Sequence, residues 1–249
     1  MPNAIAAQQA GRYWPLESEQ LKTAKLWDIA ITTGAYNLEI PDELVIRSIN
    51  MFQREGVKKI LDIGCGLGRH IHMLAERGYP VLGIDIAFSS IKKSLIKVAS
   101  CPLAYLALSD VTSLSVKSDQ FCLALAWRML HLNTKEQIKS ALEEIHRILR
   151  PNGIILCSVR STSNSLFFKA KENGEEVEKN TFVMKTKGID GLLYHFFTQE
   201  EAEKTFSKYF RDISLEEREL EHTSYTSDDK TRRNWFWVIT GRKREAPIS

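Results

Sequence analysis

The chain has 249 residues, of which 43% are hydrophobic and 26% charged, so it is long enough for one large globular domain and shows no compositional break that requires two. Its 34 Lys and Arg against 31 Asp and Glu leave a net charge of +3, too small to indicate a nucleic-acid partner, which normally needs a clustered basic face. No apolar run reaches the roughly 20 residues of a membrane span, and residues 1–10 lack the regions of a secretory signal. We therefore expect a cytoplasmic protein with no membrane partner.

The N-terminal segment, residues 12–36, is rich in aromatic residues and predicts one or two short helices ahead of the main fold. These aromatic side chains either cap a core or roof a ligand site, and they are Tyr13, Trp14, Trp27 and Tyr36. Pro41 and Asp42 then begin a predicted helix that ends before Gly56.

A glycine-rich motif follows, within residues 58–70. The apolar run Ile60–Ile63 is typical of a buried strand, and it leads into Gly64, Gly66 and Gly68 before helical spacing resumes. Glycine suits a tight turn with positive φ, or a place where a ligand lies against the main chain. The free N–H groups of the following helix would point into the same space.

The spacing of this motif separates two classes of ligand. A dinucleotide site has the pattern G-x-G-x-x-G, whereas here Arg69 stands where the third glycine would be. Asp62, before the first glycine, would suit a cationic amine better than a phosphate. The next strand, residues 81–85, ends in Asp85, whose carboxylate can accept both hydroxyls of a ribose. The alternative is that the glycines only tighten a turn and Asp85 is a surface acid.

The run from Leu61 to His70, together with Gly83–Asp85, resembles the class I S-adenosylmethionine-dependent methyltransferases, in particular the small-molecule branch with tellurite-resistance-like and ubiquinone-biosynthesis-like enzymes. The resemblance is good over residues 41–160 and loose elsewhere. It implies an α/β fold, Rossmann-like and doubly wound, with a mostly parallel seven-stranded sheet and an antiparallel C-terminal hairpin. It also implies S-adenosyl-L-methionine as cofactor, bound by Asp62, Gly64, Cys65, Gly66, Gly68, Asp85, Ile86, Asp110, Val111 and Trp127.

Two further predicted strands carry residues of this set. The strand over residues 103–108 leads to Asp110, which in the family accepts from the adenine amino group while the backbone N–H of Val111 contacts the ring. A turn carboxylate without a ligand is the alternative. The strand Phe121–Trp127 is apolar throughout, as in the middle of a parallel sheet, although Cys122 replaces an acid that the family often has.

The remaining elements are predicted from capping and alternation. Thr134 and Gln137 form a capping box at the start of a helix that Pro151 stops, and a strand follows over residues 154–159. Residues 161–195 show no clear pattern: a surface turn or flap is expected over 171–180 and a short exposed strand over 181–187. Two strands without a helix between them, residues 213–220 and 234–241, predict the closing hairpin.

We expect a single domain, 1–249, in four parts. These are an N-terminal lid or extension (1–40), a cofactor-binding core (41–160), a variable substrate-side insert (161–197), and a C-terminal helix with the closing hairpin (198–249). The N-terminal aromatics and the insert are predicted to form a lid over the acceptor pocket.

Methyl transfer from a sulfonium is an in-line displacement, so alignment and electrostatics matter most and a general base is optional. His131, just past the fourth strand, is the best-placed base, and a structural role is the alternative. Candidates on the substrate side are Trp27, Tyr36, Arg128 and His195. Arg69, Arg128 and Arg233 could hold an anionic substrate.

The acceptor is narrowed by what the sequence lacks. No Asn-Pro-Pro-Tyr or Asp-Pro-Pro-Tyr follows the fourth strand, which disfavours nucleobase methylation, and no acidic cluster there resembles the metal site of catechol-type enzymes. The four cysteines show no zinc spacing. We expect metal-independent methylation of a small molecule, with no nucleic acid and no obligate protein partner. The alternatives are a non-catalytic cofactor-binding or scaffold protein and a dinucleotide-dependent oxidoreductase.

Overall fold

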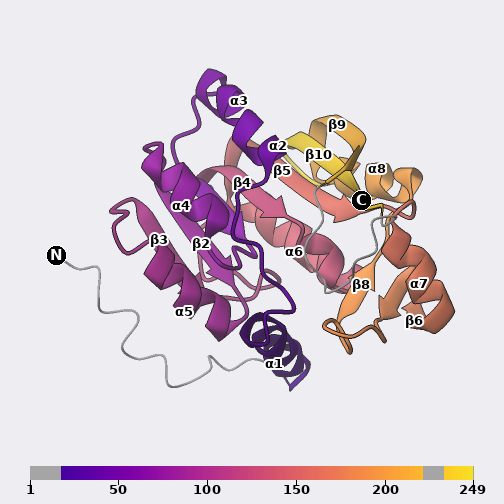
Figure 1. The fold of residues 1–249 in the computed structure, drawn as a ribbon. Helices are drawn as coiled ribbons and strands as arrows, with labels where there is room; N and C mark the ends of the chain where they lie inside the picture. The colour runs from indigo at the N-terminus through magenta and orange to yellow at the C-terminus, as the bar shows by residue number, and fades with distance from the viewer. Residues whose placement is uncertain (1–17, 221–232, 249) are drawn as a thin grey trace.

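The computed structural model describes residues 18–220 and 233–248, so Tyr13 and Trp14 lie outside the described residues. Its centre is a seven-stranded sheet of order β3-β2-β1-β4-β5-β10-β9 (Figure 1). The strands are β1 (Ile60–Ile63), β2 (Val81–Asp85), β3 (Ala104–Leu108), β4 (Phe121–Trp127), β5 (Leu149–Arg160), β9 (Phe210–Glu219) and β10 (Trp235–Lys243).

The sheet is parallel from β3 to β5 and closes with an antiparallel hairpin. β1 pairs in parallel with both β2 and β4, whereas β10 runs antiparallel to β5 and to β9. The predicted Rossmann-like fold is therefore confirmed. Strand order reverses between β1 and β4, and sheets of this kind bind ligands at the carboxyl ends of the strands beside such a reversal.

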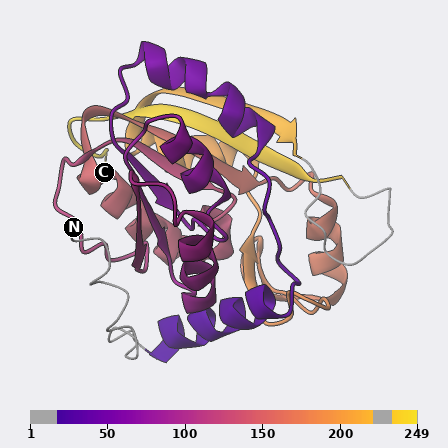
Figure 2. The same cartoon turned by 60° about the vertical axis from the view of Figure 1, so that its left-hand side comes forward.

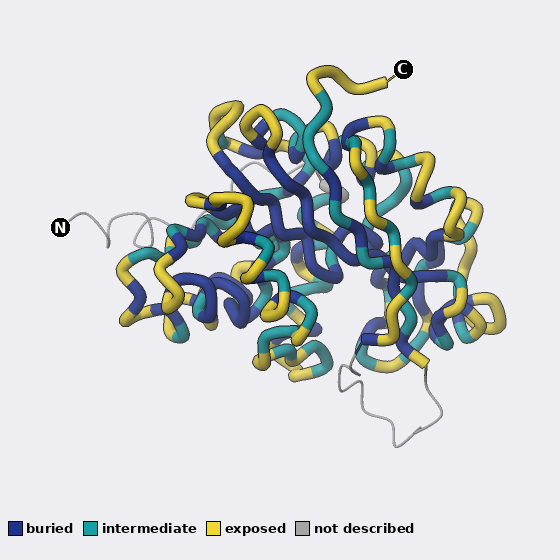
Figure 3. The backbone as a smooth tube through the Cα atoms, turned by 90° about the horizontal axis from the view of Figure 1, so that it is seen from above, coloured by how far each residue is buried: buried dark blue, intermediate teal, exposed yellow. Residues whose placement is uncertain are grey.

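Helices cover both faces of the sheet. One face packs against α3 (Ile49–Arg54), α4 (Arg69–Glu76) and α5 (Phe88–Lys97), and the other against α6 (Lys135–Ile148) and α8 (Gln199–Ser207). The central strands are buried, including every residue of β1 and β4 (Figure 3). Burial on both faces explains why these strands read as near-continuous apolar runs.

Two helix starts follow the predicted capping. The capping box of Thr134 and Gln137 is present at α6, with both reciprocal hydrogen bonds. Asp42 caps α2 (Glu43–Arg47) by accepting from the backbone N–H of Leu44. The single helix predicted after Pro41 is split, because the chain turns at Ser48 before α3 begins.

The insert between β5 and α8 is more ordered than the sequence predicted. It holds α7 (Ser165–Asn173) and a separate antiparallel sheet of β6 (Glu175–Glu178), β7 (Thr181–Val183) and β8 (Leu193–His195). The expected flap over 171–180 is wrong, since helix and strand occupy it. The expected exposed strand is shorter, and its Thr181 and Phe182 are buried.

The N-terminal helix, α1 (Ser18–Thr32), lies beside this insert (Figures 1 and 2). Ala30 shares a hydrophobic cluster with Leu166, Phe182 and Tyr194 of the insert, and Trp27 packs against the same cluster. Two segments far apart in sequence thus support each other at one end of the main sheet. No helix in the described ranges is long and apolar enough to cross a membrane.

Candidate functional site

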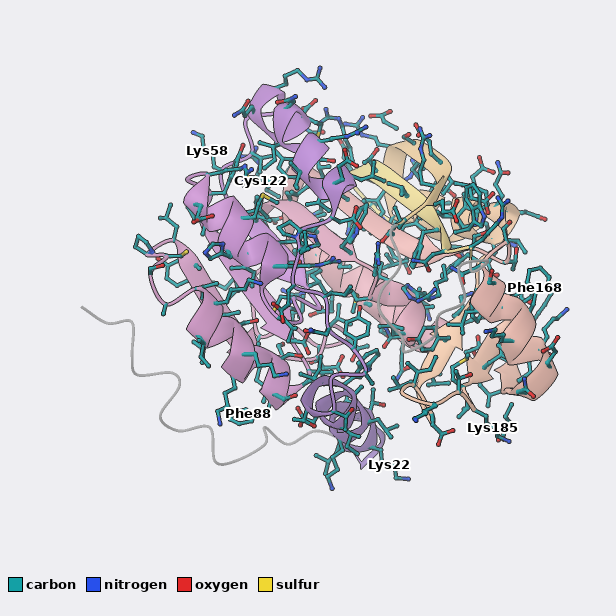
Figure 4. All side chains as sticks on the ribbon, viewed as in Figure 1. Lys22, Lys58, Phe88, Cys122, Phe168 and Lys185 are labelled. Atoms are coloured by element: carbon teal, nitrogen blue, oxygen red, sulfur yellow. The ribbon has the colours of Figure 1, made fainter. Side chains whose placement is uncertain are left out.

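A cavity enclosing about 800 Å³ of empty space, part of it open to solvent, lies at the carboxyl ends of β1 to β4. Residues following each of these strands line it, and α1 supplies another wall. Figure 4 shows Lys58 and Cys122, which precede or begin strands, at the opposite end of the sheet from Lys22 of α1. The cavity therefore occupies the edge where doubly wound folds bind ligands.

The three glycines after β1 have different roles, although all have positive φ (66°, 54° and 75°). A Cβ on Gly64 would lie 2.7 Å from Met129 Cβ, and one on Gly68 would lie 2.9 Å from Ser94 Oγ. A Cβ on Gly66 would meet no atom within 4 Å, and Gly66 lines the cavity. Gly64 and Gly68 thus permit close packing, whereas Gly66 leaves a space that a ligand could fill.

Asp85, at the end of β2, is tied to the glycine loop. Its Oδ2 accepts from the backbone N–H of Gly66 (2.8 Å) and its Oδ1 from that of Ala87 (2.9 Å). Burial raises the pKa of Asp85 to about 6, although both hydrogen bonds lower it. With a pKa of about 6, Asp85 is mostly ionised at neutral pH. The Ser90 side chain is a third hydrogen-bond donor to Asp85, and because a carboxylate has about four lone-pair sites, Asp85 can still accept from a ligand in the cavity.

The ends of β2 and β3 form the wall beside Asp85. Ile86, Asp110 and Val111 all line the cavity. Asp110 Oδ1 accepts from the backbone N–H and the hydroxyl of Thr112, both at 2.8 Å. This turn fixes the carboxylate of Asp110 at the cavity edge.

The opposite wall comes from α1 and the segment after it. Trp27 and Tyr36 line the cavity with their rings edge to face, 5.3 Å between centroids. Sequence reasoning placed these two at the substrate side but missed other polar lining residues, namely Gln20, Thr23, Ser90, Asn133 and Gln137. Asn133 directly precedes the capping box just past β4 and Gln137 is part of it, so the capping box was the available signal.

Arg128 is the charged residue that follows β4. It adopts φ of 60°, its backbone N–H donates to Ser158 Oγ (3.0 Å), and its guanidinium forms an ion pair with Asp42 (2.8 Å). The side chain is only 4% exposed yet borders the cavity. Burial lowers the pKa of Arg128, and Asp42 opposes that shift. The guanidinium remains charged, because arginine is not deprotonated in proteins.

Four of the cofactor-side candidates lie behind the cavity wall: Asp62, Cys65, Gly68 and Trp127. Asp62 is 1% exposed, and its Oδ2 has no hydrogen-bond partner in the part of the chain that the structure describes. Burial raises the pKa of Asp62 to about 8, against the lowering effect of Arg69. Burial likewise raises the pKa of the Cys65 thiol well above its ordinary value. These residues are therefore buried next to the residues that line the cavity and do not line it themselves.

Neither candidate histidine borders the cavity. His131, in the short 3-10 turn Leu130–Leu132, is 1% exposed and packs between Tyr194 and Phe236 at 5.9 and 5.5 Å. Burial, with nearby Arg160 and Arg128, lowers its pKa well below the ordinary range. His195 is fully buried, with Nδ1 2.8 Å from Thr181 Oγ1. Both geometries fit packing roles better than proton transfer.

Comparisons with known proteins agree with this geometry. A family model described as a methyltransferase domain matches residues 60–153. The malonyl-[acyl-carrier protein] O-methyltransferase of Hamiltonella defensa is 32% identical over 40% of this chain and 36% of its own. The tRNA N(3)-methylcytidine methyltransferase trm140 of Schizosaccharomyces pombe is 24% identical over 64% of this chain and 53% of its own.

Among solved structures, the fold is similar to the 1,6-didemethyltoxoflavin-N1-methyltransferase of Burkholderia thailandensis, determined with S-adenosylhomocysteine. The TM-score is 0.65 at 18% identity, covering 94% of each chain. The chain covers less than half of the length of three relatives found by sequence, namely 43%, 49% and, for the Hamiltonella defensa enzyme, 36%.

Proposed function

We propose that this chain is a class I S-adenosylmethionine-dependent methyltransferase, which the match of residues 60–153 to a methyltransferase-domain family supports, and that it transfers the methyl group of that cofactor to a small-molecule acceptor. The observation that carries the proposal is the link between Asp85 and Gly66. An ionised acceptor and an unfilled glycine position meet at one edge of one cavity. This combination suits a ribose and its attached chain.

The cofactor half of the cavity lies over β1, β2 and β3. In our assignment Asp85 accepts from the ribose hydroxyls, and the open space at Gly66 admits the cofactor against the main chain. Asp110 and the backbone N–H of Val111 would contact the adenine. When bound, S-adenosylmethionine supplies an electrophilic methyl group on a sulfonium.

The acceptor half lies on the β4 side, between α1 and the residues after β4. Trp27, Tyr36 and Met129 give it apolar walls, and Asn133 supplies a polar group. Such a lining holds a small molecule in one orientation and excludes water from the reacting atoms. His131 and His195 are not given a base role, because both are buried away from this space. The chain contributes alignment and electrostatics.

The lid that we propose is smaller than the one predicted from the sequence. Within the described ranges, α1 and Tyr36 line the cavity, whereas the insert contributes no lining residue. The insert instead packs against Trp27 and Tyr36 from outside. We assign the lid role to α1 and a supporting role to the insert.

Incubation with methyl-tritiated S-adenosylmethionine, a panel of small organic acids, amines, phenols and thiols, and total tRNA tests the proposal. Label in small-molecule products is expected. Label in tRNA alone would contradict the small-molecule acceptor, which matters because two relatives are named for tRNA. Binding of S-adenosylhomocysteine without any transfer would favour the scaffold alternative, and binding of NADH in its place would favour an oxidoreductase.

A further inference from the structure

Three arginines are buried together beside the acceptor half of the cavity. Arg69, Arg128 and Arg160 are 7%, 4% and 4% exposed. Arginine is rarely buried so fully unless it is paired with an anion. A group of three buried arginines is therefore expected to have several negative charges close to it.

The negative charges within the described residues fall short. Asp42 pairs with Arg128 at 2.8 Å. In the described part of the chain neither Arg69 nor Arg160 forms a salt bridge: Arg69 donates to the carbonyl of Ile40 (3.0 Å), and Arg160 donates to Asn234 Oδ1 (3.1 Å). Arg160 also stacks on Phe236 at 4.8 Å, and its buried Nε has no hydrogen-bond partner among the described residues.

Two neighbouring titratable groups within the described ranges, Asp62 and His131, add little negative charge. Asp62 has its pKa raised to about 8 by burial, so its carboxyl is largely protonated at neutral pH. His131 is kept neutral by burial and by Arg160 and Arg128. Among described residues the cluster thus holds three guanidiniums and the carboxylate of Asp42.

The guanidiniums influence one another through a poorly solvated region. After burial, Arg128 is the main cause that lowers the pKa of Arg69, and Arg160 also lowers the pKa of Arg128. Like charges held together out of water are costly, and an anion brought beside them offsets that cost. Arg128 is the member of the cluster that borders the cavity, with Tyr36 on the same lining.

The position of Arg128 separates it from the cofactor assignments. It follows β4, whereas Gly66, Asp85 and Asp110 follow β1, β2 and β3, on the other side of the strand-order reversal. S-adenosylmethionine has one carboxylate of its own, so an anion that still binds at Arg128 when the demethylated cofactor is present would belong to the acceptor. The planar guanidinium fork matches carboxylate and phosphate oxygens.

We propose that the acceptor carries an anionic group, a carboxylate or a phosphate, which Arg128 binds in the acceptor half of the cavity, with Arg69 and Arg160 reinforcing its positive potential. This inference rests on the proposed function, because the acceptor half is defined by it. It narrows the acceptor to small organic acids or phosphate esters.

The test compares anions with neutral molecules of similar shape. The wild-type protein, with and without S-adenosylhomocysteine, is titrated with acetate and acetamide, malonate and malonamide, benzoate and benzamide, and methyl phosphate, at constant ionic strength. With S-adenosylhomocysteine bound, at least one anion is expected to bind about tenfold or more tightly than its neutral counterpart, or than acetamide in the case of methyl phosphate. A preference for anions that disappears when S-adenosylhomocysteine is bound would overturn the inference, because the anion would then occupy the place of the cofactor's own carboxylate. The carboxylate and phosphate arms identify which group is preferred.

The variants assign that preference to Arg128. Arg128→Gln is expected to abolish it, Arg128→Lys to retain part of it, and Arg150→Gln, which alters an exposed arginine, to leave it intact. Because Arg128→Gln leaves Asp42 buried without this partner, the double variant D42N/R128Q removes both charges and guards against misfolding.

Equal binding of anions and amides, absence of binding by either, or a preference that survives in Arg128→Gln and D42N/R128Q would overturn the inference. Binding of S-adenosylhomocysteine, read in the same titrations, reports separately on the proposed function.

Discussion

Asp28 of α1 caps the N-terminus of α5, although Ser89 lies 61 positions further along the chain. Asp28 Oδ1 accepts from the backbone N–H of Ser89 at 2.8 Å and from its hydroxyl at 2.6 Å. The N-cap residue of α5, Ala87, has no side-chain cap of its own. Asp28 thus joins α1, which lines the cavity, to free backbone N–H groups at the start of α5. A further hydrogen bond between the same two helices runs from Lys93 Nζ to the carbonyl of Ile31 (2.9 Å).

Replacing Asp28 with Ala should loosen this attachment of α1. We expect a loss of about 0.5–2 kcal/mol in stability, as for other cap removals, and a fall in methyl transfer larger than the fall in S-adenosylhomocysteine affinity. Thermal melting, calorimetry and turnover measure the three effects. Asp190→Ala, at an exposed aspartate, is the control. Unchanged turnover in Asp28→Ala would refute the lid role of α1.

The Gly66→Ala variant tests whether the ligand needs the open space beside Gly66. A non-glycine residue at φ of 54° costs about 1–2 kcal/mol, and the added Cβ enters the open space on the cavity. We expect a folded protein with S-adenosylhomocysteine affinity reduced about tenfold or more. Gly78→Ala is a matched control, because Gly78 has φ of 84°, open space around its Cβ position and no place in the cavity lining. Equal affinity losses in both variants would indicate a general backbone effect.

Asp62→Asn should change how stability depends on pH. The pKa of Asp62 rises from 3.8 to about 8 on folding, so between these values the folded protein holds a proton that the unfolded chain releases. The contribution of Asp62 to the free energy of unfolding therefore falls as pH rises, by at most about 1.4 kcal/mol per pH unit. Asn cannot ionise.

Urea unfolding from about pH 5 to about pH 8 should consequently show Asp62→Asn gaining stability relative to wild type as pH increases. A difference that stays constant over this range would mean that Asp62 is ionised in the folded protein.

The sequence predicted the main sheet well, because its signals are local. Phe121–Trp127 matches β4 to the residue, and the glycines and Asp85 come at the ends of the strands that were predicted. The insert was expected, but its three-stranded sheet was not, because strands as short as Thr181–Val183 depend on packing, here against α1, rather than on their own pattern.

The acceptor side was less predictable for a similar reason. The spacing of His131 past β4 does not reveal that a 3-10 turn directs it into an aromatic cluster. The ion pair of Arg128 with Asp42 joins residues 86 positions apart, and nothing local in the sequence indicates it. Tertiary packing decided which of these polar residues border the cavity.

The central claim is that the cavity binds S-adenosylmethionine with its ribose on the ionised carboxylate of Asp85. Calorimetric titration of S-adenosylhomocysteine into wild type and Asp85→Asn, repeated above and below about pH 6, tests it most directly. We predict binding to wild type that weakens as pH falls through the pKa of Asp85, and binding to Asp85→Asn that is about tenfold or more weaker at neutral pH and nearly independent of pH. Equal affinity of the two proteins at neutral pH would contradict the claim.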